Sequence, residues 1–230
     1  LSAGHSGTRS PHKQEHGAVA AVKSRDACES LAIRYEYFGT TVAPITFQEW
    51  LNGISGVLEK GHRGWLCGHH NLHSLFMLQR NSDISRFYGR CNDCYIDGMP
   101  VRLILRGFGV KTTAKQRFSM MDRFLELLQH AEIYDWSIFY LGSQESVVDV
   151  ARDSLQSRFP DLRIQLQHGY NRDDRTLIHS INTFRPDILL VGMGMPTQER
   201  WLLEYLDQLD VGFVTQAGAT LDYYSGAQAK

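Results

Sequence analysis

The sequence has little of what marks membrane-spanning, secreted or nucleic-acid-binding proteins. Its 230 residues contain no run of about 18 apolar residues, the length of a candidate transmembrane helix. We find no basic segment followed by an apolar one, the pattern of a secretion signal, so we expect a cytoplasmic protein. The formal net charge of −1 argues against broad electrostatic binding of nucleic acid. With 43% hydrophobic and 21% charged residues, the composition is that of a globular protein.

Cysteine is scarce, and its spacing does not predict a metal site. The chain has four cysteines: Cys28, Cys67, Cys91 and Cys94. Only the last two form a Cys-x-x-Cys pair, and no second pair completes a zinc site. The pair also does not open a helix after a strand, as a redox motif does. We therefore expect reduced, structural thiols, no metal and no cofactor.

Two nucleotide-binding motifs are missing as well. No Gly-x-Gly-x-x-Gly follows a first strand, which argues against a Rossmann-type dehydrogenase or methyltransferase. The segment Tyr140-Leu141-Gly142-Ser143 has only a superficial similarity to the glycine turn of such enzymes. No Asp-x-Asp motif is present to hold a divalent metal on a nucleotide-sugar diphosphate. A diphosphate leaving group would therefore need arginines and helix amino-termini to stabilise it.

The apolar pattern predicts one α/β domain after a short leader. Residues 1–25 lack an apolar period and are predicted to be a disordered leader, and residues 26–230 are predicted to form one domain. Strands are expected at 35–42, 65–67, 94–96, 137–141, 163–167, 188–191 and 211–215. Helices are expected at 47–58, 72–78, 100–107, 118–130, 145–159, 175–184 and 198–209. Such alternation is typical of a Rossmann-like, mostly parallel sheet with helices on both faces.

Small and polar residues follow several of the expected strands. In Asp187–Trp201 a buried strand runs into a Gly-x-Gly-x-Pro turn, and Gln198-Glu199 then opens a helix. The other strand-end loops are 97–98, 142–143 and 216–222. Parallel strands share a direction, so these loops should meet at one edge of the sheet, where nucleotides bind in such folds.

Asp97 is the sharpest candidate for catalysis. A carboxylate at the end of a buried strand, followed by glycine, is positioned to act as a general base. An Asp before a helix is also a common amino-terminal cap. The residues alone leave both interpretations open.

Histidines gather just after the strand at 65–67. His69 and His73 have a spacing that would place two imidazoles on one helical face, as in some metal sites, and His70 lies between them. No acidic third ligand follows, so we favour a polar or substrate-facing cluster. Asn71 in the same turn is expected to bind a sugar or to cap the helix. A basic stretch, residues 102–117, is either a solvated face or a site for diphosphate or anionic lipid.

In order along the chain, these motifs resemble the WecG/TagA/CpsF family of bacterial glycosyltransferases. The resemblance covers roughly residues 65–230. Its blocks are Asn71 at a strand end, Tyr95-Ile96-Asp97-Gly98, Arg117 with Asp122, the long signature from Gly192 to Trp201, and Gly218 to Gly226.

The resemblance implies an inverting, metal-independent transferase of bacterial polysaccharide biosynthesis. It would move N-acetylmannosamine, its uronic acid or glucose from UDP to a polyprenyl-diphosphate-linked acceptor. It would work peripherally, on the inner face of the plasma membrane and its anionic surface. The implied catalytic residues are Asp97, as the base, and His69. The implied donor-binding residues are Asn71, Arg117, Asp122, Gly142, Gly192, Gly194, Gln198, Gly218 and Asp222.

Three departures from the family pattern keep an alternative open. His69 stands where the family usually has threonine, and Met120 replaces a glycine. The basic, aromatic carboxyl-terminal tail typical of the family is also not found. These departures favour a catalytically silent nucleotide-binding module as the second hypothesis. Apolar surface left by a missing tail would also favour a homo-oligomer.

Overall fold

A computed structural model describes residues 20–22, 33–171 and 173–226. Of the predicted leader, residues 1–19 and 23–25 lie outside this range. Ala20–Val22 forms strand β1, which pairs antiparallel with β2 (Arg34–Tyr37). Cys28 also lies outside the described residues.

The main sheet has six strands, all parallel, in the order β5-β4-β9-β8-β6-β7. The strands are β4 (Trp65–His70), β5 (Asp93–Ile96), β6 (Ile138–Gly142), β7 (Ile164–Gln167), β8 (Ile188–Gly192) and β9 (Phe213–Gln216). Every residue of β8 is buried, as expected for an apolar strand covered on both faces. The predicted Rossmann-like α/β fold is confirmed.

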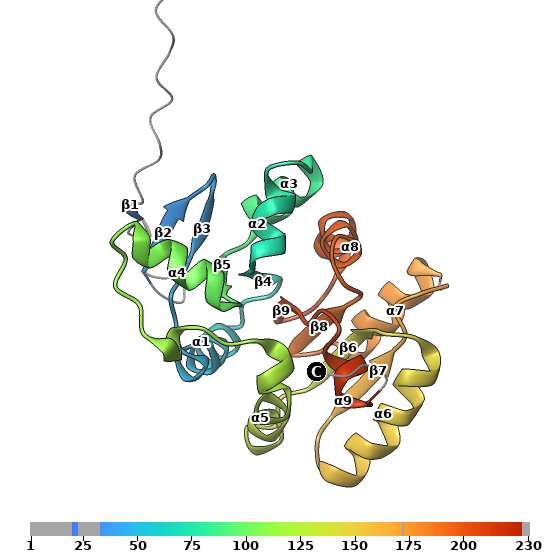
Figure 1. The fold of residues 1–230 in the computed structure, drawn as a ribbon. Helices are drawn as coiled ribbons and strands as arrows, with labels where there is room; N and C mark the ends of the chain where they lie inside the picture. The colour runs from blue at the N-terminus through green and yellow to red at the C-terminus, as the bar shows by residue number, and fades with distance from the viewer. Residues whose placement is uncertain (1–19, 23–32, 172, 227–230) are drawn as a thin grey trace, which may run out of the picture.

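Helices cover both faces of this sheet (Figure 1). One face carries α1 (Phe47–Glu59), α5 (Met120–Ile133), α6 (Glu145–Arg158) and α9 (Thr220–Tyr224), whose apolar residues share one core cluster. The other face carries α3 (Ser82–Arg90), α7 (Asp174–Phe184) and α8 (Thr197–Tyr205) around a second cluster. Two short 3₁₀ helices are η1 (Ala114–Gln116) and η2 (Leu206–Gln208).

A small antiparallel sheet replaces the single strand predicted at 35–42. The chain turns at Phe38 and Gly39, whose φ angles are 47° and 77°, so β2 and β3 (Thr40–Val42) form a hairpin. Positive φ at both turn residues suits a two-residue hairpin turn, and glycine adopts it without strain. The prediction of one continuous strand was wrong because it considered the apolar residues on both sides and overlooked the turn at Phe38 and Gly39.

The small sheet attaches to the edge of the main sheet beside β5. The backbone N–H of Ala43 donates to the carbonyl of Cys94 at 2.7 Å. A third core cluster joins the hairpin to α2 (Leu72–Leu78) and α4 (Met99–Gly107). The first turns of α2 and α4 therefore lie at the carboxyl ends of β4 and β5, where Asn71 and Asp97 also are.

The three described thiols lie inside the protein. Cys67, Cys91 and Cys94 are buried and free. A Cβ atom at Gly68 would lie 3.0 Å from the sulfur of Cys91 and 3.1 Å from that of Cys94, so these two thiols pack directly on the β4 backbone.

Candidate active site

The predicted strand-end loops meet at one edge of the sheet. Because β4, β5, β6, β8 and β9 are parallel neighbours, their carboxyl ends point the same way. The catalytic candidates come from β4 and β5, and most of the predicted donor-binding residues follow β6, β8 and β9.

His69 and Asp97 face each other across the ends of β4 and β5. The Nε2 atom of His69 lies 3.7 Å from Oδ2 of Asp97, and their side chains are 9% and 22% exposed. Burial lowers the pKa of His69 below its ordinary value, against the opposing charge of Asp97. Burial therefore favours the neutral form of the His69 imidazole, which lies beside an Asp97 side chain that solvent still reaches.

The three histidines do not form one cluster, and this part of the prediction was wrong. His69 and His70 belong to strand β4 itself, so their side chains point to opposite faces of the sheet. The ring of His70 is within hydrogen-bonding distance of Thr40 and Ser74, at 3.1 and 3.2 Å. His73 is exposed on α2.

Asn71 caps a helix, whereas Asp97 does not. The Asn71 side chain accepts a hydrogen bond from the N–H of Ser74 at 2.8 Å, as part of a capping box at the start of α2. The cap position of α4 is Gly98, with φ of 105° and no side-chain cap bond. The alternative interpretation of Asp97 as a cap is therefore not observed, and its carboxylate faces His69.

A buried polar network joins β4, β9 and α8 behind His69. Gln216 Oε1 accepts from the backbone N–H of His69 at 3.0 Å, and its Nε2 donates to Glu199 Oε1. Gln198 also donates to Glu199, at 2.8 Å, and accepts from the N–H of Gly218 at 3.3 Å. Gln198 thus uses its amide to fix the glycine loop after β9.

Glu199 is the centre of this network, and the sequence analysis did not select it. It is fully buried, and burial raises its pKa to about 7 despite the amides that donate to it. Its Oε2 atom has no hydrogen-bond partner among the described residues. The Gln198-Glu199 pair at the start of α8 was visible in the sequence, but only the fold brings Gln216 to it.

Glycines allow β6, β8 and the loop after β9 to approach closely. Gly142 and Gly192 are register partners, and a Cβ on Gly142 would lie 2.2 Å from the Gly192 carbonyl oxygen. A Cβ on Gly192 would lie 2.1 Å from the hydroxyl of Tyr140 and 2.7 Å from the carbonyl oxygen of Gly218. These two glycines therefore have a packing role, whatever ligand contacts they also make.

Two other glycines face open space at the same edge. Gly194 and Gly218 have φ of 75° and 56°, and no atom lies within 4 Å of a Cβ built on either. Beside them, Ser143 donates to Asp222 Oδ2 at 2.9 Å and so ties the end of β6 to α9. This backbone leaves room for a ligand to approach.

Arg117 lies in the segment between β5 and α5, and Asp122 lies in the first turn of α5. The N–H of Phe118 donates to the carbonyl of Ile96 at 3.1 Å, which places Arg117 beside the end of β5. Asp122 is exposed in the first turn of α5. Met120, the departure from the family pattern, begins α5 and is buried in the core.

Comparison with known proteins identifies the family to which the chain belongs. The family model "Glycosyl transferase WecG/TagA/CpsF family" matches residues 35–230. The chain belongs to this glycosyltransferase family. The match begins in the β2–β3 hairpin, upstream of the residues that carried the resemblance, so it includes this hairpin but not β1.

Curated relatives of the family come from Staphylococcus aureus. The protein of strain NCTC 8325 / PS 47, named N-acetylglucosaminyldiphosphoundecaprenol N-acetyl-beta-D-mannosaminyltransferase, is 28% identical over 167 residues. The protein of the same name from strain MRSA252 is 27% identical. Each match covers 68% of this chain, which in turn spans only 65% of the relatives' length.

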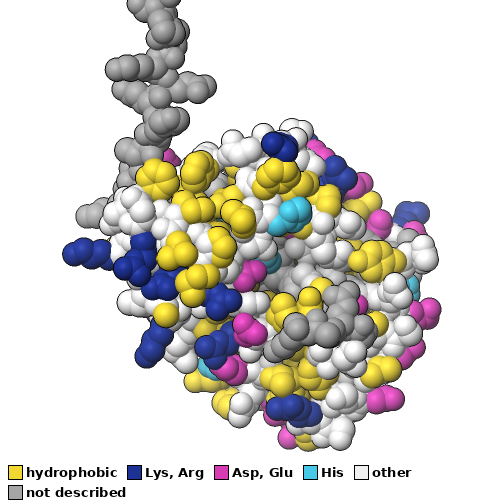
Figure 2. All heavy atoms as spheres, viewed as in Figure 1, with side chains coloured by type: hydrophobic (Ala, Val, Ile, Leu, Met, Phe, Trp, Pro, Cys, Tyr) yellow, Lys and Arg dark blue, Asp and Glu magenta, His cyan; other side chains and the backbone are white. Residues whose placement is uncertain are grey.

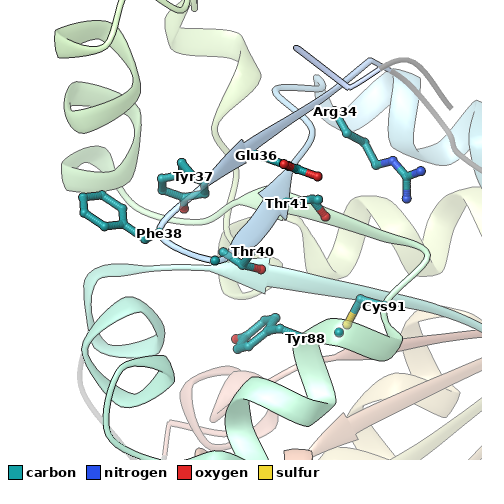
Figure 3. Close-up of a pocket in the computed structure, with 10 residues that line it drawn as sticks. Arg34, Glu36, Tyr37, Phe38, Thr40, Thr41, Tyr88 and Cys91 are labelled. Carbon is teal, nitrogen blue, oxygen red and sulfur yellow. The ribbon is translucent and has the colours of Figure 1, made fainter. Parts of the chain in front are cut away.

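The protein also has a pocket that lies away from the carboxyl ends of the strands. It measures about 550 Å³ and lies between the β2–β3 hairpin and α3 (Figure 3). Arg34, Glu36 and Thr41 face it from the hairpin, and Tyr88 and Cys91 from the end of α3. None of the predicted site residues is among the described residues that line it. The Tyr88 hydroxyl links this pocket to the site, because it donates to the carbonyl of His69 at 2.9 Å.

The described residues contain no group of three or more His, Cys, Asp or Glu side chains that could hold a metal ion. None of the helices there has the length and apolar character needed to cross a bilayer.

Proposed function

We propose that this protein transfers a sugar from UDP to a polyprenyl-diphosphate-linked acceptor, with inversion, in bacterial polysaccharide biosynthesis. The observation that carries the proposal is the position of Asp97. It lies at the carboxyl edge of a parallel sheet, free of a capping role, beside the buried imidazole of His69. Membership of a glycosyltransferase family and the names of the relatives support the reaction class.

In the proposed mechanism Asp97 is the general base. It takes the proton from the acceptor hydroxyl while that oxygen attacks the anomeric carbon of the donor. The bond to the UDP oxygen breaks on the opposite side, so the configuration inverts and UDP leaves with the electron pair. His69 Nε2, 3.7 Å away, would hold the carboxylate in place.

The donor would lie along the ends of β6, β8 and β9. Gly194 and Gly218 leave backbone accessible there, and Asp222 would lie near the nucleoside. Arg117, together with the amino-terminus of α8, would neutralise the diphosphate as it leaves, without a metal ion. Gln198, Asn71 and Asp122 would help to hold the donor.

The relatives' names suggest which sugar is transferred and which lipid accepts it. They name N-acetylmannosamine as the transferred sugar and N-acetylglucosaminyl-diphosphoundecaprenol as the acceptor. We propose the same pair here, with the uronic acid and glucose as alternative donors. An undecaprenyl acceptor would place the protein peripherally on the inner face of the plasma membrane.

The test of the base is Asp97→Asn. Removing a general base typically costs about 10²- to 10⁴-fold, so transfer should fall by that factor. Binding of UDP and the thermal unfolding midpoint should stay close to wild type, because the half-buried side chain caps no helix. The matched control is Asp153→Asn, an exposed carboxylate on α6, which should leave turnover unchanged. Normal turnover in Asp97→Asn would exclude Asp97 as the base.

A silent nucleotide-binding module is the second candidate. Its support is His69, a buried histidine beside Asp97 where the family usually carries threonine. Selective UDP binding by the full-length protein, with no transfer to the lipid-linked acceptor even after His69→Thr, would favour it. Transfer by the wild-type protein would exclude it.

A further inference from the structure

Exposed apolar side chains are concentrated on one face of the molecule. Six large side chains between 42% and 57% exposed come from the hairpin turn, α2, and α4 with the residue after it. We call them the α2–α4 apolar face: Phe38, Leu72, Phe76, Met99, Leu103 and Phe108. Figure 2 shows hydrophobic side chains gathered over these elements at the upper left of the molecule. An exposed group of this kind usually marks an interaction surface.

The α2–α4 apolar face begins beside the candidate active site. Leu72 directly follows Asn71, and Met99 is two residues beyond Asp97. The first turns of the two helices lie together, because a Cβ on Gly98 would be 3.8 Å from that of Asn71. The apolar face and the proposed base therefore share one rim of the protein.

Helices α2 and α4 each carry two exposed apolar residues that lie one helical turn apart. Leu72 and Phe76 are four residues apart on α2, as Met99 and Leu103 are on α4, so each pair lies on one helical face. At the far end the rings of Phe38 and Phe108 contact each other, with centroids 6.0 Å apart. The face is thus continuous from the site to the hairpin turn.

The two segments that carry α2 and α4 contain basic residues and no acidic ones. Residues 71–80 and 98–121 contain no Asp or Glu, although the whole chain has 25 acidic residues. The same segments contain six basic residues: Arg80, Arg102, Arg106, Lys111, Lys115 and Arg117. None of the six forms an ion pair within the described part of the chain. The guanidinium of Arg80 lies over the ring of Phe76, 4.1 Å from its centroid. In Figure 2, basic side chains border the apolar ones.

We propose that the α2–α4 apolar face docks on an anionic lipid bilayer. Apolar side chains bordered by unpaired cations match the boundary between acyl chains and negative headgroups. The proposed mechanism assigns Arg117 to the diphosphate, so five cations remain for this surface. A protein partner would need acidic groups placed against each of these five separately, whereas anionic lipids supply charge over the whole surface. The inference rests on the proposed function, because it explains how a lipid-anchored acceptor would reach Asp97 without leaving the membrane.

The test is co-sedimentation of the full chain with two kinds of vesicle, phosphatidylcholine alone and a mixture with phosphatidylglycerol. The wild-type protein should bind the mixed vesicles and bind less at high salt. The double variant Phe76→Glu/Leu103→Glu should lose about tenfold or more in partitioning, because two apolar contacts become repulsive charges. The control Ile133→Glu/Val150→Glu changes side chains that are 69% and 57% exposed on α5 and α6, and it should bind like the wild type.

A soluble acceptor separates this inference from the proposed function. With a short-chain acceptor that does not need a membrane, Phe76→Glu/Leu103→Glu should transfer as well as the wild type, and only transfer to vesicle-bound acceptor should fall. Vesicle binding without transfer from either acceptor would refute the proposed function and leave the docking face intact. Equal loss of binding in the test and control variants would overturn the docking face. So would a wild-type dimer that only the test variant dissociates, because this face would then join two copies of the chain.

Discussion

At the scale of single residues, burial decides which groups near the site carry charge. His69 and Glu199 are both buried, and burial moves their pKa values in opposite directions, toward the neutral form of each. Asp97 is the acidic side chain of the His69–Asp97 pair and keeps access to solvent. The proposed base therefore lies in front of a layer of groups whose pKa values favour the uncharged form.

Glu199 gives this arrangement a measurable pH dependence. Its pKa is about 7 in the folded protein and 4.5 as the ordinary value. Between these values the unfolded chain has lost a proton that the folded protein keeps, so stability should fall as pH rises through this window. Glu199→Gln keeps the carbonyl acceptor and removes the titration. The difference in unfolding free energy between wild type and variant should shift by about 3 kcal/mol between pH 4.5 and 8.

Urea denaturation at pH steps across that window measures the difference. Glu59→Gln, at the exposed end of α1, is the matched control and should follow the wild-type curve. The low pKa of His69 has the opposite effect, since it favours stability at higher pH, but it acts equally in both proteins and cancels in the comparison. Parallel curves for wild type and Glu199→Gln would mean that Glu199 has the same pKa in the folded and unfolded chain.

At the scale of elements, close approach of strand ends shapes the donor side. Gly142→Ala would bring a Cβ within 2.2 Å of the Gly192 carbonyl oxygen, and backbone on both sides must move to relieve it. We expect a loss of about 3 kcal/mol in unfolding free energy, at the upper end for overpacking. Gly56→Ala, on α1 with no atom within 4 Å, should instead be neutral or stabilise by about 0.5–1 kcal/mol. Chemical denaturation distinguishes the two, and an unaffected Gly142→Ala would show that the strand ends can separate freely.

The elements themselves were largely predictable because their apolar period is strong. The buried run 188–191 and the helical spacing around Trp50 each have one structural solution. Helix α3 was missed, although Asn81 caps it and Ile84, Phe87 and Tyr88 have helical spacing, because polar residues dominate that stretch. Asp97 and Asn71 were proposed as site residues from their expected place after a strand, and the structure puts both residues there. The contact of Gln216 with Glu199 could not be predicted from the sequence, because it joins residues 17 apart through the packing of α8 against β9.

At the scale of the whole molecule, the fold keeps three features apart. The His69–Asp97 pair lies at the ends of β4 and β5, the accessible glycines lie after β8 and β9, and the α2–α4 apolar face extends away from the site. A nucleotide sugar and a lipid-linked acceptor would then approach Asp97 from different directions. Changes on one side should leave binding on the other side intact.

Thermal unfolding with nucleotides tests this separation. A ligand at 100 times its Kd stabilises the folded state by about 2.7 kcal/mol, which for a chain of this size raises Tm by roughly 5–10 °C. UDP should give this rise equally with magnesium or with EDTA, and ADP should give much less. Asp97→Asn and Phe76→Glu/Leu103→Glu should keep the rise, whereas Asp222→Ala should reduce it, because only Asp222 belongs to the donor side. A larger rise with ADP, or a rise that needs magnesium, would contradict the proposed metal-independent UDP site.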